Sequence, residues 1–390
     1  MSEVLLNKGQ EEAYSKLIDF MFNTEKYFIL SGMPGTGKST LINLIENKLL
    51  KMYQDTCKCV DMEPEYHGVS VTATTNSAAD NLSVASRTIF SYLNLIVRNR
   101  KLEQRSKPYS KGEIIIIDEY TMLDDEAWKY VEKLDGCKII LVGDKDQLLA
   151  VSGMSPAIRR LPVNYELTEI MRTDSTDILK VVRAFKALVN NEEPEELDLN
   201  NLTDVECISP EEFDELICDP DFSFVDSRII THTNQKSIEC NQFIRAARGL
   251  PEHFTVGETV SNNSYRAIGN RSFKTDGEFH ILEVNPVICK DLSENGIDPL
   301  NTYTVRHAGG TDIVIHGPDK YKHFDLRSRY SSTVYKAQGR SFETIYIDLT
   351  GFPDNITRDV LVRSLYVGAS RARKKVVFIG ELSERLQDKL

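Results

Sequence analysis

Residues 32–39, with the sequence GMPGTGKS, constrain the fold of this chain more than any other stretch, because they match the pattern G-x-x-x-x-G-K-[ST]. An apolar segment, Tyr27–Leu30, precedes the motif, and an amphipathic segment, Thr40–Leu50, follows it. The order predicts a strand, a glycine-rich turn and a helix. Such a turn binds phosphate, since glycines let backbone N–H groups curl around the oxygens and the helix dipole favours negative charge.

The side chains of this motif predict a site for ATP and Mg²⁺. We expect Lys38 to neutralise the β- and γ-phosphates and the Ser39 hydroxyl to hold Mg²⁺. The residues predicted to bind the nucleotide in and beside the turn are Gly35, Thr36, Gly37, Lys38, Ser39 and Thr40.

Polar residues at the ends of two later apolar runs complete the predicted site. Four isoleucines, Ile114–Ile117, lead into Asp118 and Glu119. We expect Asp118 to bind Mg²⁺ and Glu119 to act as the general base on the attacking water. A third run ends at Gly143–Gln147, and the Gln147 amide is predicted to orient that water near the γ-phosphate.

The order of apolar and amphipathic segments predicts an α/β fold with parallel sheets. Beside Tyr27–Leu30, the expected strands of the first set are Val69–Thr72, Glu113–Ile117 and Lys138–Val142, and Gln10–Phe22 is an expected helix with Asn7 as its cap. A second set is expected at Arg228–Thr231, Thr344–Asp348 and Lys375–Gly380. Residues 249–325 are rich in Gly, Asn and short alternating stretches, which predicts an inserted antiparallel β module.

Charge is distributed unevenly along the 390 residues, whose formal net charge is −12. Residues 187–227 contain 14 acidic residues and no basic one, so the rest of the chain is close to neutral. A short stretch concentrates positive charge at Arg98, Arg100, Lys101, Arg105, Lys107 and Lys111, opposed only by Glu103. Because binding depends on the local field, the net charge does not exclude a nucleic acid ligand.

Apolar and cysteine patterns predict a cytoplasmic protein. No apolar run reaches the roughly 18–20 residues that cross a bilayer, and the first residues become charged too early for a secretory signal. The seven cysteines show no repeated C-x-x-C spacing, which argues against a disulfide scaffold.

An ordered series of motifs resembles those of superfamily 1 helicases, and more closely those of their RecD/Dda-like branch. Besides the phosphate-binding turn and the Asp118–Glu119 pair, the matching segments are residues 7–10 (NKGQ), 71–79 (VTATTNSAA), 87–93 (RTIFSYL), 167–172 (LTEIMR), 332–339 (STVYKAQG) and 365–373 (LYVGASRAR). The likeness runs almost from end to end. Two aromatic residues, Phe90 and Tyr335, stand where this branch commonly has histidine.

The resemblance implies roles for particular residues. Gln10 would read the adenine, Arg172 would reach the γ-phosphate and Arg371 would be the arginine finger. Predicted contacts to DNA are Thr75, Asn76, Phe90, Arg98, Arg100, Thr333 and Lys336. Phe90 has two interpretations that the sequence does not separate, which are stacking on a base and packing under the sheet.

The resemblance also implies an architecture of two RecA-like P-loop lobes. The first lobe would comprise residues 1–86 and 114–165, with an inserted β-hairpin pin at 87–113. The second would comprise 166–248 and 326–390, with an inserted small β-barrel at 249–325. An ATP-dependent DNA helicase that moves 5′ to 3′ on single-stranded DNA is the predicted function.

Other functions and partners stay open at this point. An ATP-driven translocase that displaces bound proteins, an ATP-gated nucleic-acid-binding module and an RNA substrate fit the same motifs. The expected ligands are single-stranded and forked DNA, with a single-strand-binding or replication protein as a candidate partner of the acidic 192–226 region. A monomer without membrane attachment, phage-encoded and located in the host cytoplasm, is the further expectation.

Overall fold

A computed structural model of the chain describes residues 6–80, 82, 86–99, 101–196, 201–219, 222, 224, 226–251, 253–262, 266–268, 271–273, 277–287, 300–307, 312–316 and 326–390. The chain divides into two compact units. Unit 1 comprises residues 1–197, 338–341 and 359–374, and unit 2 comprises 198–337, 342–358 and 375–390. The sequence expectation placed 166–197, 338–341 and 359–374 in the second lobe, whereas their contacts place them in unit 1.

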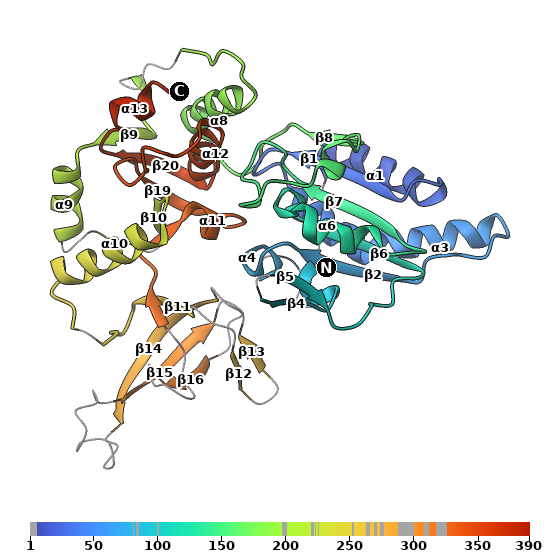
Figure 1. Cartoon of the computed structure of the whole chain (residues 1–390), viewed down its shortest axis with the longest axis horizontal. Helices are drawn as coiled ribbons and strands as arrows, with labels where there is room; N and C mark the ends of the chain where they lie inside the picture. Colours follow the sequence, from blue (N-terminus) through green and yellow to red (C-terminus); the bar gives the residue numbers. More distant parts are fainter. Residues whose placement is uncertain are drawn as a thin grey trace. The chain divides into compact units, whose positions relative to one another are not determined.

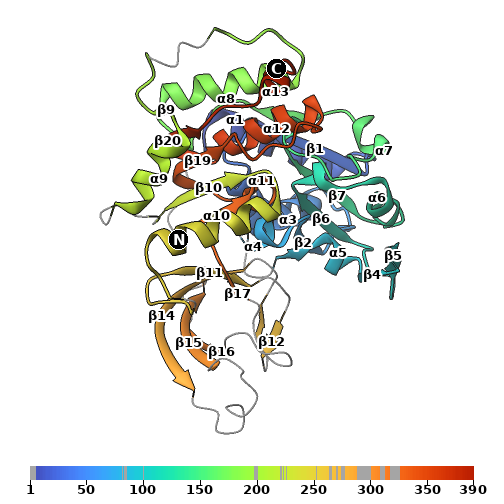
Figure 2. The same cartoon turned by 60° about the vertical axis from the view of Figure 1, so that its left-hand side comes forward.

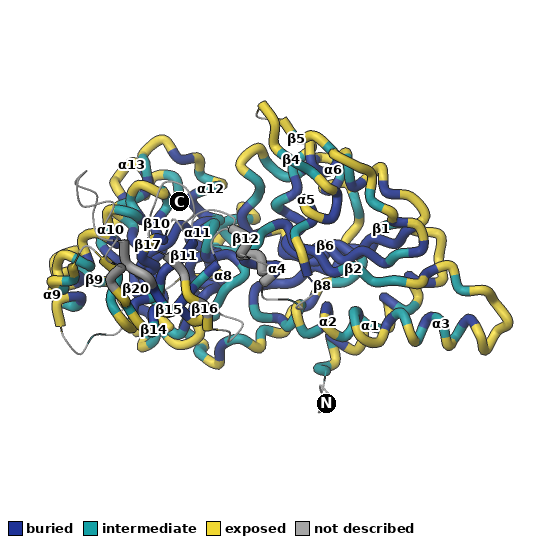
Figure 3. The backbone as a smooth tube through the Cα atoms, turned by 90° about the horizontal axis from the view of Figure 1, so that it is seen from below, coloured by how far each residue is buried: buried dark blue, intermediate teal, exposed yellow. Residues whose placement is uncertain are grey.

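Unit 1 is built on a six-stranded parallel sheet with the order β3-β2-β6-β7-β1-β8. Its strands are β1 (Tyr27–Gly32), β2 (Gly68–Ala73), β3 (Arg87–Thr88), β6 (Glu113–Asp118), β7 (Lys138–Gly143) and β8 (Tyr165–Leu167). The four strands expected from the sequence are confirmed. Figure 3 shows the middle of this sheet buried, which explains why its strands read as continuous apolar runs.

Two apolar layers cover the sheet of unit 1. On one face, α1 (Lys8–Phe22), α2 (Lys38–Leu44) and α3 (Leu50–Cys59) contribute Leu17, Phe20, Leu41 and other buried residues to one core cluster. On the other face, α5 (Ile89–Tyr92) and α6 (Asp125–Glu132) contribute to a second cluster around Trp128. Further helices of unit 1 are α4 (Asn76–Asp80), η2 (Tyr120–Met122), α7 (Pro156–Arg159) and α8 (Thr176–Val189).

Both helices that the sequence predicted around the phosphate-binding turn are present, and the second is longer than expected. The expected helix at Gln10–Phe22 is confirmed as α1, whose capping box pairs the side chains and backbone N–H groups of Asn7 and Gln10. The expected helix at Thr40–Leu50 is too short. Helical backbone continues from α2 through a π-helical turn, η1 (Ile45–Leu49), into α3, because Leu49, Tyr53 and Cys57 extend the buried stripe.

A β-hairpin interrupts the connection from α5 to β6. Its strands β4 (Leu95–Arg98) and β5 (Lys101–Gln104) pair antiparallel, with Leu95 opposite Gln104 and Arg98 opposite Lys101. Figure 2 and Figure 3 both show the hairpin beside α6. The hairpin lies where the sequence predicted a pin.

Unit 2 contains a second sheet with the order β18-β10-β19-β20-β9, in which β10 pairs parallel with β18 and β19, and β20 with β9. The strands are β9 (Val205–Ile208), β10 (Ser227–Thr231), β18 (Ser331–Thr333), β19 (Phe342–Asp348) and β20 (Ala372–Ile379). Its helices are α9 (Pro210–Cys218), α10 (Asn234–Ala247), α11 (Val334–Ala337) and α13 (Glu384–Gln387), while α12 (Arg358–Ala369) lies almost wholly in unit 1. The second α/β set is confirmed.

An antiparallel module follows α10 in unit 2 (Figure 1). It has the order β16-β15-β14-β11-β17 and a separate hairpin β12–β13. The strands are β11 (Thr259–Asn262), β12 (Arg266–Ile268), β13 (Arg271–Phe273), β14 (Glu278–Val287), β15 (Leu300–His307), β16 (Asp312–His316) and β17 (Leu326–Ser328). Closure into a barrel stays a prediction, since residues 288–299, 308–311 and 317–325 lie outside the described residues. In the described part of the chain, no helix has the length and apolarity to span a bilayer.

Candidate ATPase site and nucleic-acid contacts

The phosphate-binding turn of unit 1 joins β1 to α2 in a conformation that requires glycine. Gly35 and Gly37 have φ angles of +86° and +82°. A Cβ atom at Gly35 would lie 2.5 Å from the Cβ of Arg172, and one at Gly37 would overlap the Gln10 side-chain amide. The glycines therefore allow both the left-handed backbone and the close approach of Gln10 and Arg172.

Lys38 begins α2 and turns back over the loop. Its Nζ donates hydrogen bonds to the carbonyl oxygens of Gly32 at 2.6 Å and Met33 at 2.9 Å. Burial lowers the pKa of Lys38, while the carboxylates of Asp144, Glu119 and Asp118 oppose that shift. The ammonium group is thus bonded to the turn and lies within the electrostatic field of three carboxylates.

Asp118 and Glu119 lie at the carboxyl end of β6, with side chains 8% and 6% exposed. Glu119 has a left-handed backbone at φ +55°, its N–H donates to Asp118 Oδ1 at 3.0 Å, and the Thr74 hydroxyl donates to its carbonyl at 3.0 Å. Burial and the neighbouring Glu119 raise the pKa of Asp118 to about 7. Asp118 and the Ser39 hydroxyl line one cavity and supply the oxygen donors that Mg²⁺ prefers.

Gln147 is hydrogen-bonded to Arg371 directly and is linked to Glu119 through Gln338. Its Oε1 accepts hydrogen bonds from Arg371 Nη2 at 3.2 Å and from Gln338 Nε2 at 3.3 Å, and its Nε2 donates to Asp144 Oδ2 at 3.4 Å. Gln338 also donates to Glu119 Oε2 at 3.2 Å. Gln338 was not among the predicted site residues, although the 332–339 motif that contains it was the available signal.

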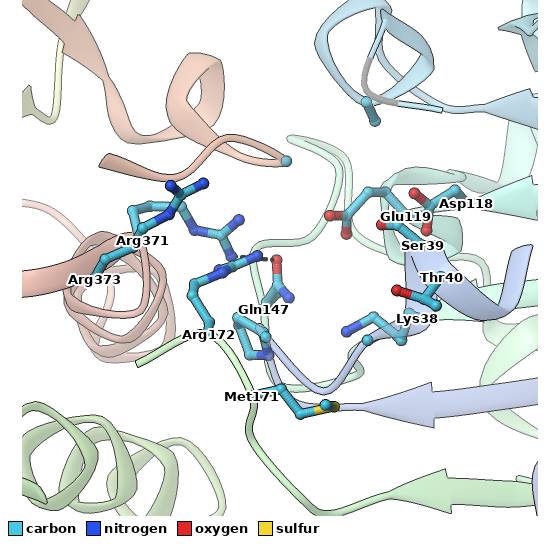
Figure 4. Close-up of a pocket in the computed structure, with 15 residues that line it drawn as sticks. Lys38, Ser39, Thr40, Asp118, Glu119, Gln147, Met171, Arg172, Arg371 and Arg373 are labelled. Carbon is cyan, nitrogen blue, oxygen red and sulfur yellow. Dashed lines mark hydrogen bonds between the residues drawn. The ribbon is translucent and has the colours of Figure 1, made fainter. Parts of the chain in front are cut away.

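Two arginines lie opposite the acidic pair in the same cavity (Figure 4). Arg371 is 1% exposed and donates from Nε to the Val367 carbonyl at 3.2 Å. Arg172 donates from Nη1 to the Ser370 carbonyl at 2.9 Å. Burial and the neighbouring Arg371 lower the pKa of Arg172 to about 9, and burial lowers the pKa of Arg371. The arrangement concentrates positive charge beside the carboxylates.

The cavity has a volume of about 470 Å³ and lies wholly within unit 1. Most predicted nucleotide-site residues line it, namely Gly35, Gly37, Lys38, Ser39, Thr40, Asp118, Glu119, Gln147, Arg172 and Arg371. Thr36 is buried beneath the loop, where its hydroxyl donates to the Met33 carbonyl at 2.9 Å. Gln10 is 2% exposed, and its amide is bonded to Asn7 N and the Gly37 carbonyl. Its proposed reading of adenine would require that amide to rearrange.

The predicted DNA contacts of unit 1 lie on several elements. Thr75 and Asn76 follow the carboxyl end of β2 and are partly exposed. Phe90 is also partly exposed and packs against the Trp128 cluster, which favours the packing interpretation for part of its ring. Arg98 is exposed on the hairpin, whereas Arg100 lies outside the described residues.

The predicted contacts of unit 2 lie next to each other at the carboxyl end of β18. Thr333 is 5% exposed, and its hydroxyl accepts a hydrogen bond of 3.4 Å from Lys336 N at the start of α11. Lys336 is partly exposed. The structure thus gives Thr333 a local role in the turn and leaves Lys336 on the surface.

Comparison with known families is consistent with this geometry. Residues 5–206, slightly more than half of the chain, match the family model described as an AAA domain. The chain belongs to this family. Residues 328–379 of this AAA domain protein match the UvrD-like helicase C-terminal domain. With both domains matched and residues of each lining one cavity, the protein is an ATP-hydrolysing helicase of superfamily 1.

Among curated proteins, the AAA domain protein is 21% identical to an uncharacterized protein of Acanthamoeba polyphaga mimivirus, over 97% of this chain and 100% of that one. Its fold is similar to the Pif1 helicase from Bacteroides in complex with ADP-AlF3 and ssDNA, with a TM-score of 0.64, 16% identity and coverage of 98% and 94% of the two chains. Pif1 helicase from Candida albicans has a TM-score of 0.56, 16% identity and 99% coverage of both chains. A structure of two Pif1 helicases at forked dsDNA has a TM-score of 0.58, 17% identity and coverage of 96% and 92%.

Proposed function

We propose that the protein is an ATP-dependent helicase that translocates 5′ to 3′ on single-stranded DNA and separates duplex DNA. One observation carries the ATPase part of this proposal. Lys38, Glu119, Gln147, Arg172 and Arg371 line a single cavity. Their proximity supports the assignment of a cation that binds phosphate, a base, an amide that orients water and two cations for the charge that develops in the transition state.

The positions of these side chains support a role for each of them. Lys38, Ser39 and the glycine-rich turn would hold the phosphates. Ser39 and Asp118 would hold Mg²⁺, which would supply charge neutralisation when bound. Glu119 would take a proton from the attacking water, and Gln147 would orient that water. Arg371 already contacts Gln147, so a shift of this amide with the state of the nucleotide would be transmitted to the arginine.

Two observations support DNA as the substrate. Predicted DNA contacts are found on both units, and two structural relatives are described with ssDNA or forked dsDNA. Unit 1 carries Thr75 and Asn76, and unit 2 carries Thr333 and Lys336. If each unit holds one part of a strand, alternate tightening during the ATP cycle moves the strand through the protein.

The β4–β5 hairpin would separate the strands. Its Val97 side chain is 74% exposed, next to the exposed Arg98 and Lys101. Successive side chains of a strand point to opposite faces, so the exposed apolar side chain can lie against the terminal base pair while the cations of the other face hold the phosphates.

An unwinding assay tests the function directly. Duplexes with a 5′ tail or a 3′ tail, in DNA and in RNA, would be incubated with ATP and Mg²⁺. We expect separation of the 5′-tailed DNA alone. ATP turnover and single-strand movement without strand separation would favour the protein-displacing translocase. Negligible turnover would favour the ATP-gated binding module.

Several finer assignments, made from the sequence alone, stay predictions. They are membership of the RecD/Dda-like branch with phage Dda as near relative, a monomeric state, contact of a replication or single-strand-binding protein with the acidic 192–226 region, and a cytoplasmic location.

A further inference from the structure

A second cavity of unit 1, of about 220 Å³, lies between the base of the hairpin and α6. Its lining residues are Gln104, Lys107, Pro108, Tyr130, Lys133 and Leu134. Two hydrogen bonds fix the hairpin against the helix, from the Tyr130 hydroxyl to the Leu102 carbonyl at 2.9 Å and from Leu102 N to Glu126 Oε1 at 2.9 Å. The walls are thus held in place by contacts between two elements.

Two of the six residues that line this cavity are lysines. Lys107 and Lys133 line it, Arg105 and Lys111 lie on the same segment, and all four side chains are exposed. Among the described residues, none of these four cations has a carboxylate within 4.0 Å. Exposed cations without acidic partners are available to bind an anion.

The acidic side chains on the two sides of Lys133 in the sequence already have hydrogen-bond partners. Glu132 Oε1 accepts a hydrogen bond from the Trp128 indole at 2.8 Å, and Asp135 Oδ1 accepts one from Gly136 N at 2.9 Å. They weaken the positive field, yet their hydrogen bonds direct them to the helix and to the turn.

Aromatic rings accompany the lysines. Tyr109 is 78% exposed, two residues after Lys107. The Tyr130 ring forms a wall of the cavity and has the Lys133 Nζ 4.9 Å from its centre. Exposed aromatic rings among cations are typical of sites for single-stranded nucleic acid, since an unpaired base offers a face for stacking that a duplex does not.

The cavity lies at the opposite end of the sheet from Thr75 and Asn76, two of the predicted strand-contacting residues. Gly112 N donates to the Gly136 carbonyl at 2.7 Å, which joins the segments just before β6 and β7. Thr75 and Asn76 instead follow the carboxyl end of β2, which pairs in parallel with β6. A six-residue strand spans roughly 20 Å at about 3.3 Å per residue, so the two places are separate.

We propose that the cavity between the hairpin base and α6 binds single-stranded DNA, and that its ligand is the strand displaced at the fork. This inference rests on the proposed helicase function, because only a protein that separates strands at the hairpin produces a displaced strand there. Lys107 and Lys133 contact phosphates, and Tyr109 stacks on a base.

Photocrosslinking identifies the strand without requiring unwinding. Tyr109→p-benzoylphenylalanine would be irradiated without ATP on a fork with two single-stranded tails, each carrying its own fluorophore. We expect crosslinks to the tail that the protein does not track, with the tracked tail assigned by the unwinding assay. Crosslinks mainly to the tracked strand or to the duplex would overturn the proposal. So would labelling no stronger than that of Met62→p-benzoylphenylalanine, a control at a position 55% exposed after α3.

Affinity measurements test the cations. Lys107→Glu combined with Lys133→Glu should weaken binding to the two-tailed fork by about 10-fold. The slope of log affinity against log salt concentration should become shallower by the equivalent of roughly two phosphate contacts. Binding to a duplex that has only the tracked tail should stay within about 2-fold of the wild type. Lys48→Glu with Lys51→Glu, on the exposed side of the η1–α3 helix, is the matched control.

The outcomes separate this inference from the proposed function. Equal loss of binding to both substrates, or loss to neither, would overturn the displaced-strand site. Failure of the helicase proposal would instead appear in the wild-type protein, as ATP turnover on either DNA substrate without separation of the strands.

Discussion

The hydroxyl of Tyr366 donates a hydrogen bond of 2.7 Å to Oδ2 of Asp144, and both residues are almost fully buried. The same carboxylate oxygen accepts a hydrogen bond from Gln147 Nε2 at 3.4 Å. Burial and the Asp144 carboxylate raise the pKa of Tyr366, so its hydroxyl stays protonated and donates. Tyr366 on α12 therefore helps to fix the orientation in which Gln147 presents its oxygen to Arg371 and Gln338.

Tyr366→Phe should lower kcat about 3- to 10-fold and change KM for ATP little, because Gln147 loses a fixed partner while the phosphate-binding turn is intact. The free energy of unfolding should fall by about 1–3 kcal/mol, since a buried carboxylate loses a donor. Steady-state ATPase kinetics and denaturant unfolding measure the two effects.

Tyr330→Phe is the matched control, since the Tyr330 hydroxyl donates to Glu258 Oε2 at 3.2 Å in unit 2. It should lose a similar free energy of unfolding and keep kcat. Equal losses of kcat in both variants would mean that Tyr366 acts only through stability.

Lys38→Ala should abolish ATP turnover and unwinding together, with a fall in kcat of at least about 100-fold, because it removes the cation that holds the phosphates. Phosphate release and strand separation would be measured on one preparation. ATP turnover close to that of the wild type would mean that the nucleotide does not bind in this cavity.

Glu119→Gln should bind ATP and single strands with near wild-type affinity and hydrolyse ATP about 10²- to 10⁴-fold more slowly, since only the base is lost. Titration with a fluorescent ATP analogue and a phosphate-release assay separate binding from hydrolysis. Loss of ATP binding would assign Glu119 to the ground-state complex instead of to the base role.

Arg371→Ala should depress kcat by about 10³-fold or more and change nucleotide affinity far less, because a finger stabilises charge that develops in the transition state. Arg373→Ala, at an exposed position of the same cavity, is the comparison and should retain most activity. A change confined to affinity would make Arg371 a clamp for bound ATP.

We expect the exposed side chains of the hairpin to be needed for separating the strands of a duplex and not for translocation along a single strand. Replacing residues 98–111 entirely would also remove Leu102, which packs against the Trp128 cluster, and the bond between the Ser110 hydroxyl and the Asp135 carbonyl. The sharper variant combines Val97→Ser, Arg98→Ala and Lys101→Ala. It should keep DNA-stimulated ATPase and single-strand translocation and lose about 10-fold or more in unwinding rate. A proportional fall in ATPase would place the hairpin in the motor's strand path.

The local elements of the site follow from the sequence, because each depends on neighbouring residues. A run of β-branched isoleucines ending in Asp118 and Glu119 favours a buried strand with acids at its end, and glycines at 35 and 37 permit the positive φ angles of a phosphate-binding turn. The cap formed by Asn7 and Gln10 is likewise encoded within four residues. The parallel α/β fold could therefore be predicted before any coordinate was known.

Contacts between distant segments were decided by the tertiary structure alone. Gln338 meets Glu119 and Gln147 across 219 and 191 residues of sequence, and Tyr366 meets Asp144 across 222. The cavity between the hairpin and α6 depends in the same way on Leu102 meeting Tyr130. Periodicity and motif spacing report only local geometry. Which side chains become hydrogen-bonded partners is set by how the apolar faces pack, and that packing is a property of the whole unit.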